Sequence, residues 1–579
     1  MEIAKRPLPM TKKELDEMGV SQPDFIIVSG DAYIDHPSFG TAVIGRTLEA
    51  EGFSVAVIAQ PDWKNTSDFT KLGKPRLAFL VNSGNVDSMV ANYSVAKRKR
   101  DYDYYSPAGK SGKRPDRAVI VYCNKIREAF GSVPILIGGI EASLRRFAHY
   151  DYWDNKIRKS ILIDSGADIL SYGMGEKSVV QFAKLLDKGV PVKKIRSIAG
   201  TCVLAPSDYL PSAEHIILPD YTSLLKNKRA YADSFKTQYK NCDSVSGKVL
   251  CERYPEGMLV QNPPQKPLNT KELDESANLP YTRDIHPVYK KDGVPALKEV
   301  QFSVTHNRGC FGGCAFCAIA YHQGRAVTSR SIDSVIKEVE LLTTLPDFKG
   351  YIHDIGGPTA NFRTGPCKAV AEGKKGVCTN RRCLTPEPCP NLDISHLQYI
   401  ELLERASKVK GVKKVFVRSG IRHDYVMADK KYGDRFISLL AKNHVSGQLR
   451  TAPEHIAAEV LTAMGKPSFK VHEQFCDKFY AASKKAGLEQ YVVPYLMSSH
   501  PGSTMACAKK LNDYIKKHNL KSEQVQDFYP TPSTAATVMY YTGIDPFTKK
   551  EVYCATNPEQ KRAQRQLLTK KQYKKPRRK

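Results

Sequence analysis

The chain lacks the features of a membrane or secreted protein. No run of 18 or more apolar residues occurs among its 579 residues, and the first seven, MEIAKRP, hold no apolar stretch of the kind that opens a signal peptide. A spread framework of cysteines is also missing, because half of the 14 cysteines fall in two clusters. Clustered thiols suit metal binding in a reducing compartment better than disulfides, so we expect a cytoplasmic protein with no membrane partner.

Acidic residues are scarce relative to basic ones. The sequence holds 60 Asp and Glu against 88 Lys and Arg, a formal net charge of +28, which favours association with nucleic acids or other polyanions. Residues 561–579 contain ten Lys or Arg and no acid. We expect them to form a disordered basic tail that either binds RNA or only aids solubility. Residues 97–105, KRKRDYDYY, interleave charge with aromatic rings as single-strand binders do, and they equally fit an exposed loop.

Three cysteines form a compact group. Cys310, Cys314 and Cys317 are spaced C-x3-C-x2-C within the glycine-bearing stretch RGCFGGCAFC. A [4Fe-4S] cluster normally takes four cysteines, so a three-cysteine loop leaves one iron open to a ligand from outside the protein. The alternative is a structural zinc site with His306 or His322 as the fourth ligand.

A second group of four cysteines lies in a lysine-rich and proline-rich insertion, residues 366–390. Its members are Cys367, Cys378, Cys383 and Cys389, spaced C-x10-C-x4-C-x5-C. This spacing matches neither the zinc-finger patterns nor the usual ferredoxin runs. Three interpretations stay open: a structural zinc or small-domain staple, an auxiliary iron-sulfur cluster, and unligated thiols.

Hydrophobic periodicity predicts an α/β fold for the first part of the chain. Residues 25–29 and 54–58 are short apolar strands separated by an amphipathic helix in residues 40–51. Further apolar strands alternate with helices, which predicts a Rossmann-like, doubly wound parallel sheet in residues 1–205. Residues 206–295 hold many prolines and few long apolar runs, so we expect a connecting segment there.

The second large domain is predicted in residues 296–560. Residues 300–304 alternate as a strand does, and the cysteine loop follows directly. After the loop, apolar residues recur at helical spacing through residues 332–342, with Ser331 or Asp333 as the expected cap. The order is therefore strand, cysteine loop, helix.

This order, the cysteine spacing and the aromatic residue before the third cysteine resemble the radical S-adenosylmethionine (SAM) enzymes. The resemblance implies that the three cysteines hold a [4Fe-4S] cluster whose open iron binds SAM, and that residues 296–560 form a partial (β/α) TIM-like barrel. It also implies that one electron from a flavodoxin- or ferredoxin-like donor cleaves SAM to methionine and a 5'-deoxyadenosyl radical.

The same resemblance implies a set of SAM-binding residues at the strand ends. The backbone of a glycine pair is expected to meet the SAM amino group, and polar side chains at later strand ends are expected to contact the rest of the molecule. The expected residues are Gly356, Gly357, Arg418, Ser419, Asp424 and Glu454. Each of them equally fits a stability contact at the barrel rim, although active sites of such barrels gather at these strand ends.

The first domain resembles the cobalamin-binding-type Rossmann domain that precedes the barrel in many radical SAM proteins. Residues 138–143, GGIEAS, and residues 172–176, YGMGE, carry this resemblance. Proteins that ligate cobalt by histidine use Asp-x-His-x-x-Gly, whereas residues 35–40 read DHPSFG. We therefore expect neither a cobalt ligand at His36 nor bound cobalamin. Together with the segment at 524–543, these motifs make the whole chain, the basic tail excepted, similar to the bacterial YgiQ-like radical SAM proteins.

The sequence thus predicts a radical SAM enzyme whose substrate it does not name. Modification of RNA or of a ribosomal component is the hypothesis that uses the positive charge. The rival hypothesis is a non-catalytic zinc- and nucleic-acid-binding protein, in which both cysteine groups are zinc modules. A third is an iron-sulfur redox sensor.

Overall fold

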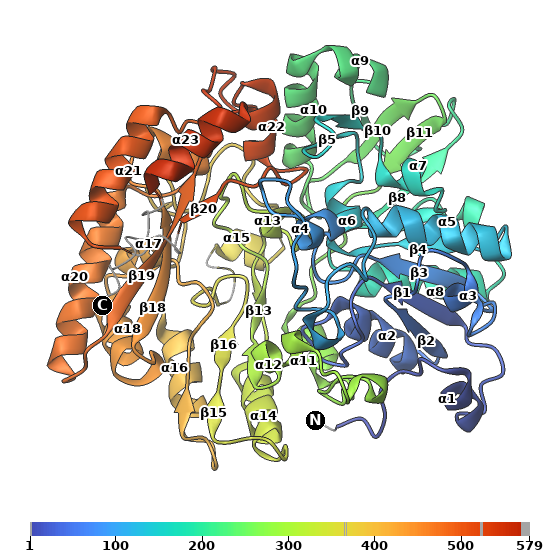
Figure 1. Ribbon diagram of the computed structural model, residues 1–579, viewed down its shortest axis with the longest axis horizontal. Coiled ribbons are helices and arrows are strands. Elements are labelled where there is room, and N and C mark those ends of the chain that lie inside the picture. Colours follow the sequence, from blue (N-terminus) through green and yellow to red (C-terminus); the bar gives the residue numbers. More distant parts are fainter. Residues whose placement is uncertain (1–2, 364, 366, 374, 521–524, 569–579) are drawn as a thin grey trace, which may run out of the picture.

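The computed structural model describes residues 3–363, 365, 367–373, 375–520 and 525–568 of a mixed α/β protein (Figure 1). Two halves lie side by side. The chain up to about residue 300, blue to green, occupies the right of Figure 1, and the rest, yellow to red, occupies the left. Within the described residues, no helix combines the length and the apolar character that a membrane crossing needs.

A nine-stranded sheet forms the centre of the first half. Five strands at one side are parallel, in the order β2-β1-β3-β4-β7. They are β1 (Phe25–Ser29), β2 (Val55–Ala59), β3 (Ala78–Asn82), β4 (Ile135–Ile137) and β7 (Ile169–Ser171). The helices that cover them include α2 (Gly40–Ala50), α5 (Ala118–Phe130) and α8 (Glu176–Asp187).

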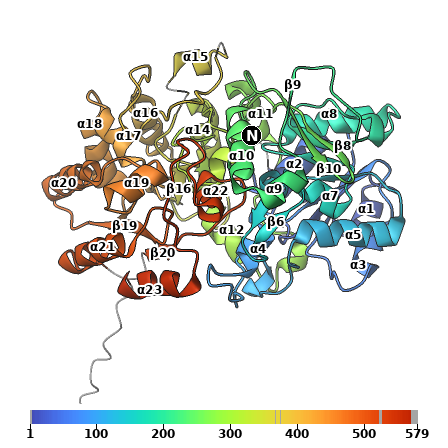
Figure 2. The ribbon, with the colours of Figure 1, turned by 90° about the horizontal axis from the view of Figure 1, so that it is seen from above.

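Both faces of this sheet are buried because alternate side chains of each strand point to opposite sides. Ile26 and Val28 of β1 join the core that contains α5, whereas Phe25 and Ile27 join the core that contains α2 and α8. Figure 2 shows helices on both sides of the sheet. The prediction of an α/β fold with a large, mainly parallel sheet is confirmed.

The predicted connecting segment is different in the structure. The sheet continues past β7 with β8 (Thr201–Ala205), β11 (Gly257–Gln261), β10 (Val249–Tyr254) and β9 (His215–Ile217), in which only the β10-β9 pair is parallel. Three strands within residues 206–295 therefore belong to the sheet. The physical reason is that the short apolar strands β10 and β11 form a hairpin whose residues are almost all buried, a signal that the prolines around it obscured.

Smaller elements complete the first half. They are α1 (Lys12–Glu17), α3 (Ser67–Thr70), α4 (Ser88–Asn92), η1 (Pro107–Gly109), α6 (Gly139–Leu144), β5 (His149–Asp151), β6 (Lys156–Arg158), α7 (Ile161–Ser165), η2 (Val192–Lys194), α9 (Tyr221–Lys226), α10 (Lys228–Lys240), α11 (Thr270–Asn278), η3 (Pro287–Tyr289) and α12 (Pro295–Val300).

The strands of the second half follow one another in chain order around an arc. They are β12 (Ser303–Thr305), β15 (Tyr351–Ile352), β16 (Asp354–Gly356), β17 (Lys414–Val415), β18 (Gln448–Glu454), β19 (Tyr491–Ser498) and β20 (Val525–Asp527). The pairs β12-β16, β15-β17, β18-β19 and β19-β20 are all parallel. Only His353 separates β15 from β16, and a parallel bridge joins Ile421 to Thr451 of β18.

Helices lie on the outside of this arc (Figure 1). The long ones are α14 (Ile332–Thr343), α16 (Leu397–Ala406), α20 (Phe469–Lys485) and α21 (Met505–Lys517). The smaller elements are β13 (Asn307–Arg308), α13 (Ile319–His322), β14 (Thr328–Ser329), α15 (Lys368–Ala371), α17 (His423–Ala428), α18 (Gly433–Leu439), the π-helix η4 (Leu440–His444), α19 (Ala458–Met464), α22 (Ala535–Thr542) and α23 (Pro558–Leu568). Helix α14 begins as predicted, since the Ser331 hydroxyl accepts a hydrogen bond from the Ser334 amide at 3.1 Å.

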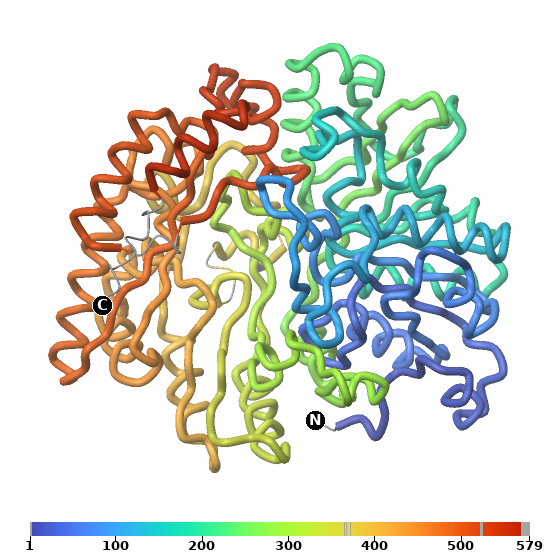
Figure 3. The backbone as a smooth tube through the Cα atoms, in the orientation of Figure 1, coloured from blue at the N-terminus to red at the C-terminus, as the bar shows by residue number. Residues whose placement is uncertain are grey.

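The last segment of the chain returns to the first half. In Figure 3 the red trace crosses the top of the molecule toward the green helices. There Tyr541 of α22 stacks on Tyr150 of β5 with ring centroids 4.7 Å apart, and the Ser533 hydroxyl donates to the Leu144 carbonyl at 2.7 Å. The two halves are therefore joined at both ends of the second half, by the chain before β12 and by α22.

Candidate functional site

The three predicted cysteines lie in one loop between β13 and α13. Burial raises the pKa of Cys317 to about 12, and the neighbouring Cys314 and Cys310 thiols contribute to the rise. The loop depends on glycine. Gly309 has a φ of +80°, and a Cβ there would overlap the Ala326 carbonyl. The loop thus gathers three partly buried thiols close enough to influence one another.

A buried arginine that sequence reasoning missed reaches this loop. The Arg422 guanidinium donates to Cys314 Sγ at 3.3 Å and forms a two-pronged ion pair with Asp424, at 2.8 and 2.5 Å. Burial alone would raise the pKa of Asp424, but Arg422 lowers it to about 2. Asp424, predicted to contact SAM, is thus engaged with Arg422, and it orients a positive charge toward the cysteines. In the sequence, only the Arg-x-Asp spacing indicated this ion pair, and that signal is weak.

The two histidines of the zinc alternative are occupied elsewhere. His306 Nε2 lies 2.8 Å from the Ala360 carbonyl, and His322 Nδ1 lies 3.1 Å from the Ser143 hydroxyl. Among the described residues, no three His, Cys, Asp or Glu side chains are grouped as ligands of one metal ion. A four-iron cluster is much larger than a single ion and spreads its ligands further apart. The arrangement therefore fits a cluster better than a mononuclear zinc site.

The predicted glycine pair lies beside the cysteine loop and leaves no room for larger side chains. A Cβ on Gly356 would overlap the Ser419 hydroxyl, and one on Gly357 would overlap Asn307 Oδ1. Cys310 Sγ lies 3.5 Å from the Thr359 hydroxyl, and the Asn307 amide donates to the Thr359 carbonyl at 3.3 Å. The structure thus brings Gly356, Gly357 and Ser419 together near Cys310.

One polar atom at this place has no partner. Asn307 Oδ1 is buried, and no hydrogen bond to it exists among the described residues. An unsatisfied buried acceptor is costly, so it marks a place where a donor from outside the protein would be stabilised. The SAM amino group is a donor of the expected kind. Sequence reasoning missed Asn307, although it lies only three residues before the first cysteine.

The other two predicted residues differ in position. Glu454 is partly buried at the end of β18 with a φ of +69°, and its carboxylate lies 3.7 Å from Lys466 Nζ. Burial raises the pKa of Glu454, while Lys466 opposes the rise. Lys466 also lies 5.9 Å from the ring centroid of Phe316, which precedes Cys317. Arg418, in contrast, is exposed, and its guanidinium lies over Phe416 rather than at the cysteine loop.

The four cysteines of the insertion line one cavity. Its volume is about 790 Å³, and Phe311 of the three-cysteine loop also lines it. The two cysteine groups therefore lie on neighbouring surfaces of the same half.

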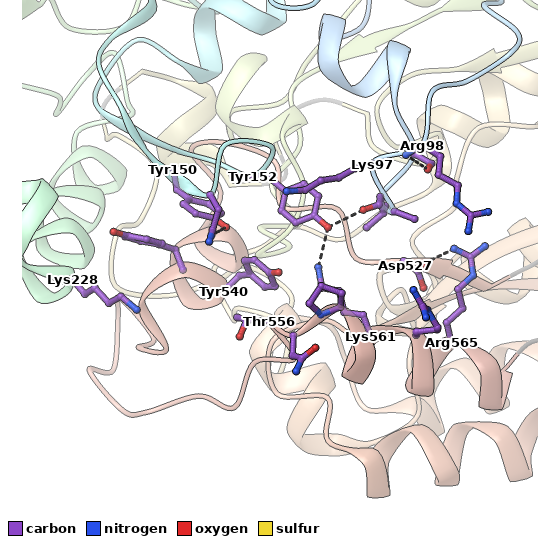
Figure 4. Close-up of a pocket in the computed structure, with 18 residues that line it drawn as sticks. Lys97, Arg98, Tyr150, Tyr152, Lys228, Asp527, Tyr540, Thr556, Lys561 and Arg565 are labelled. Atoms are coloured by element: carbon purple, nitrogen blue, oxygen red, sulfur yellow. Dashed lines mark hydrogen bonds and ion pairs between the residues drawn. The ribbon is translucent and has the colours of Figure 1, made fainter.

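A larger cavity, of about 1,090 Å³, lies between the two halves where the last segment meets the first (Figure 4). Its charged lining is six Lys and Arg against one acid, and four tyrosines accompany them. The charged and aromatic residues are Lys97, Arg98, Tyr150, Tyr152, Lys228, Asp527, Tyr540, Tyr541, Lys561, Arg562 and Arg565. The two basic stretches singled out from the sequence thus contribute to one cavity.

Lys561 is held among aromatic rings at this cavity. Its Nζ lies 4.3 Å from the Tyr540 ring centroid and 4.8 Å from that of Tyr152 (Figure 4). Burial lowers the pKa of Lys561 to about 8, although Asp527 opposes the shift. The cavity is close to the cysteine loop, because the Ala536 amide of α22 donates to the Ala315 carbonyl at 2.9 Å. Tyr540 lies one helical turn further on, about 5.4 Å along the axis.

Comparison with known proteins assigns the family. The family described as Radical SAM N-terminal matches residues 7–303, and a domain of unknown function, DUF3362, matches residues 523–577. The chain belongs to the Radical SAM N-terminal family. A UPF0313 protein of Clostridium botulinum is 55% identical over 97% of this chain and 87% of its own length, and one of Clostridium perfringens is 53% identical over 98% and 85%. These comparisons do not confirm the narrower name YgiQ-like, so that resemblance stays a prediction.

A solved structure supports the fold. The radical SAM methyltransferase TsrM from Kitasatospora setae, with cobalamin and a [4Fe-4S] cluster bound, is similar with a TM-score of 0.50 and 14% identity. The similarity covers 89% of this chain and 77% of TsrM. We predicted that cobalamin would not be bound. The TsrM structure, which resembles this chain, contains bound cobalamin and contradicts that prediction. The prediction was wrong because it relied on the absence of one histidine motif.

The place where cobalamin would be sought is the carboxyl edge of β4 and β7. There a Cβ on Gly173 would lie 3.2 Å from the His322 carbonyl, so the two halves are in contact. The cavity at this edge measures about 80 Å³, whereas small-molecule pockets span roughly 300–1,000 Å³. Cobalamin would need a rearrangement there, and we derive no step through it. His36 lies apart from this edge, buried, with its Nε2 3.4 Å from Arg283.

Proposed function

We propose that the protein is a radical SAM enzyme in which Cys310, Cys314 and Cys317 bind three irons of a [4Fe-4S] cluster. The observation that carries the proposal is the glycine-bearing loop that gathers three partly buried thiols, of which Cys314 contacts Arg422. Beside it lies Asn307 Oδ1, which has no hydrogen-bond partner among the described residues. With cluster and SAM bound, this site would supply reductive cleavage of SAM to a carbon radical. The arc of parallel strands in the second half is, on this proposal, the partial (β/α) barrel of such enzymes.

The residues of the chain have separable roles in this proposal. Arg422, oriented by Asp424, offsets the negative charge of the thiolates. Asn307 Oδ1 and the tight backbone at Gly357 form a cradle for the SAM amino group. Glu454, paired with Lys466, is the candidate to accept a hydrogen bond from SAM. The electron donor is expected to be a flavodoxin- or ferredoxin-like protein.

The test is anaerobic purification followed by reduction with dithionite in the presence of SAM. Wild-type protein should form 5'-deoxyadenosine, and the Cys310→Ala, Cys314→Ala, Cys317→Ala variant should form none and lose about four irons. Cys476→Ala is a matched control, because Cys476 is a partly buried thiol on α20, outside both groups. Absence of 5'-deoxyadenosine from cluster-replete wild type would refute the proposal. Cobalt should be measured in the same samples.

For the substrate we propose RNA, bound at the cavity of Figure 4. Cations neutralise phosphates and tyrosines stack on bases, and this cavity combines both beside the cysteine loop. The measurement is fluorescence anisotropy with a labelled single-stranded RNA at several salt concentrations. Affinity should fall steeply with salt, and it should fall when Tyr152 and Tyr540 are replaced by Leu.

The rival, a non-catalytic zinc- and nucleic-acid-binding protein, predicts the same RNA binding but a different metal. Zinc with little iron in anaerobically purified protein, and no effect of SAM, would favour it. The occupied rings of His306 and His322 count against its zinc site at the first cysteine group. An iron-sulfur redox sensor would instead show reversible cluster loss without SAM turnover.

A further inference from the structure

The four cysteines of the insertion converge although their spacing follows no known pattern. Cys367, Cys378, Cys383 and Cys389 come from a 23-residue stretch of the chain that contains one short helix, α15, and no strand among its described residues. All four line the single cavity of about 790 Å³. Chain folding alone, with so little regular structure, gives no reason for four thiols to face one space. A ligand that all four thiols bind does give such a reason.

A backbone contact also brings two of the four cysteines together. The Cys389 amide donates to the Cys383 carbonyl at 2.8 Å, which folds the last two ligand positions into one turn. None of the four forms a disulfide in the structure. They are therefore four neighbouring free thiols around a common volume.

The surroundings of the cavity are positively charged. Arg325 lines the cavity, and its Nη1 donates to the Cys378 carbonyl at 2.9 Å. Lys368, Lys375 and Arg381 line the cavity, and Asp393 is the one acid in that lining. Four thiolates with a metal cluster carry net negative charge, so this lining stabilises the loaded site rather than the empty one.

The size of the site argues for a cluster over zinc. Zinc takes four thiolates at about 2.3 Å from one centre, which packs the sulfurs tightly. The four cysteines instead line a cavity of about 790 Å³. A [4Fe-4S] cluster holds four cysteines on its corners, around a volume of its own.

The two cysteine groups share a wall. Phe311, Phe362 and Tyr425 form a small apolar cluster, with Cys310 and Cys383 both packed against it. The rings of Phe311 and Phe362 stack with centroids 3.8 Å apart. Cys310 and Cys383 therefore contact the same aromatic cluster.

We infer that Cys367, Cys378, Cys383 and Cys389 bind a second [4Fe-4S] cluster with all four irons held by protein. Its binding is independent of the proposed function at the first group. Because Cys383 and Cys310 contact the same aromatic cluster, the second site would be a one-electron centre adjacent to the first. Because it has no open iron, it does not bind SAM.

The experiment compares iron, sulfide and zinc per chain in three anaerobically reconstituted proteins. Wild type should hold about eight irons, and about four should remain both in the Cys310→Ala, Cys314→Ala, Cys317→Ala variant and in a variant with Ser at all four insertion cysteines. If circular dichroism shows that the fourfold variant is unfolded, the Cys383→Ser single variant takes its place in the comparison. Cys476→Ser should keep all of the iron.

Electron paramagnetic resonance separates the two sites without an activity assay. In the variant lacking the first group, dithionite should produce a reduced-cluster signal that added SAM leaves unchanged. In the variant lacking the second group, SAM should alter the signal.

Three results would overturn the inference: four irons in wild type that the fourfold variant retains, one zinc per chain that the fourfold variant loses, or a SAM-sensitive signal from the second group. If instead the second group binds iron but no protein cleaves SAM, the proposed function fails and the inference stands.

Discussion

The two cysteine groups are built by different means. In the first, a short loop between β13 and α13 sets three thiols through backbone conformation, and Gly309 must adopt a left-handed φ to do so. In the second, four thiols are spread along a stretch with almost no regular structure and meet only around a cavity. The first arrangement is preorganised by the fold. The second needs its ligand to hold it, because metal binding is coupled to folding where no rigid element places the donors.

The largest contrast is expected in catalysis. Cys314→Ala should lower SAM cleavage by more than about 100-fold, since removing only an outer partner of a ligand already costs roughly 10–100-fold in metal affinity or activity. Cys383→Ser should leave SAM cleavage by chemical reductant within about tenfold of wild type. The measurement is 5'-deoxyadenosine formation with dithionite. Equal losses in both variants would show that the groups are one functional unit.

A glycine should separate SAM binding from cluster binding. In Gly357→Ala, the new methyl group would overlap Asn307 Oδ1, and overpacking of this kind costs about 1–3 kcal/mol. We expect SAM to bind at least about fivefold more weakly, measured by equilibrium dialysis, with iron content unchanged in both groups. Gly420→Ala is the control, because a Cβ there has no atom within 4 Å. Loss of iron in Gly357→Ala would show that this position supports the cluster itself.

Asp424 should affect the first group alone. Asp424→Asn leaves the buried Arg422 without its partner, which costs about 3–5 kcal/mol of unfolding free energy. The positive charge then acts on Cys314 undiminished, so the reduction potential of the first cluster should rise while that of the second stays constant. Asp429→Asn, which breaks the buried pair with His396, is the control that lowers stability without shifting the potential.

The same ion pair predicts a pH dependence. The folded-state pKa of Asp424, about 2, lies below its usual 3.8. The pair therefore stabilises the fold fully above about pH 4, and its contribution is lost as the pH falls toward 2. Urea unfolding of wild type and Asp424→Asn should differ between pH 5 and 8 by a constant amount and converge in acid. A difference that grows between pH 5 and 8 would contradict this assignment.

The sequence predicted what local signals encode. The cysteine spacing, the loop glycines and the Ser331 cap of α14 are read within a few residues, and the strands of the parallel sheet follow from short apolar runs. Arg422 could not be found this way, because it reaches Cys314 from 108 residues away in the chain. Its place depends on the tertiary approach of α17 to the loop.

The cavity of Figure 4 also could not be predicted from local sequence patterns. Both of its basic stretches were visible in the sequence, but nothing local says that residues 97–98 and Lys561 meet. The pairing of β11 with β8 is a further case, since these strands are more than 50 residues apart in the chain. Sequence patterns therefore identified the groups of residues, and the fold determined which groups face one another.

The smallest expected effect lies outside both cysteine groups. At pH 7, Lys561→Met should reduce the salt-dependence slope of RNA binding by about 0.7, the value for one phosphate contact on a single strand, with iron content unchanged. Because burial lowers the pKa of Lys561 to about 8, the positive charge is present at pH 7 and mostly lost at pH 9. RNA affinity of wild type should thus weaken over that range, whereas Lys561→Arg, which stays charged, should not show this loss. Anisotropy titrations at pH 7, 8 and 9 measure it, and identical pH profiles for wild type and the Lys561→Arg variant would contradict a phosphate contact at this side chain.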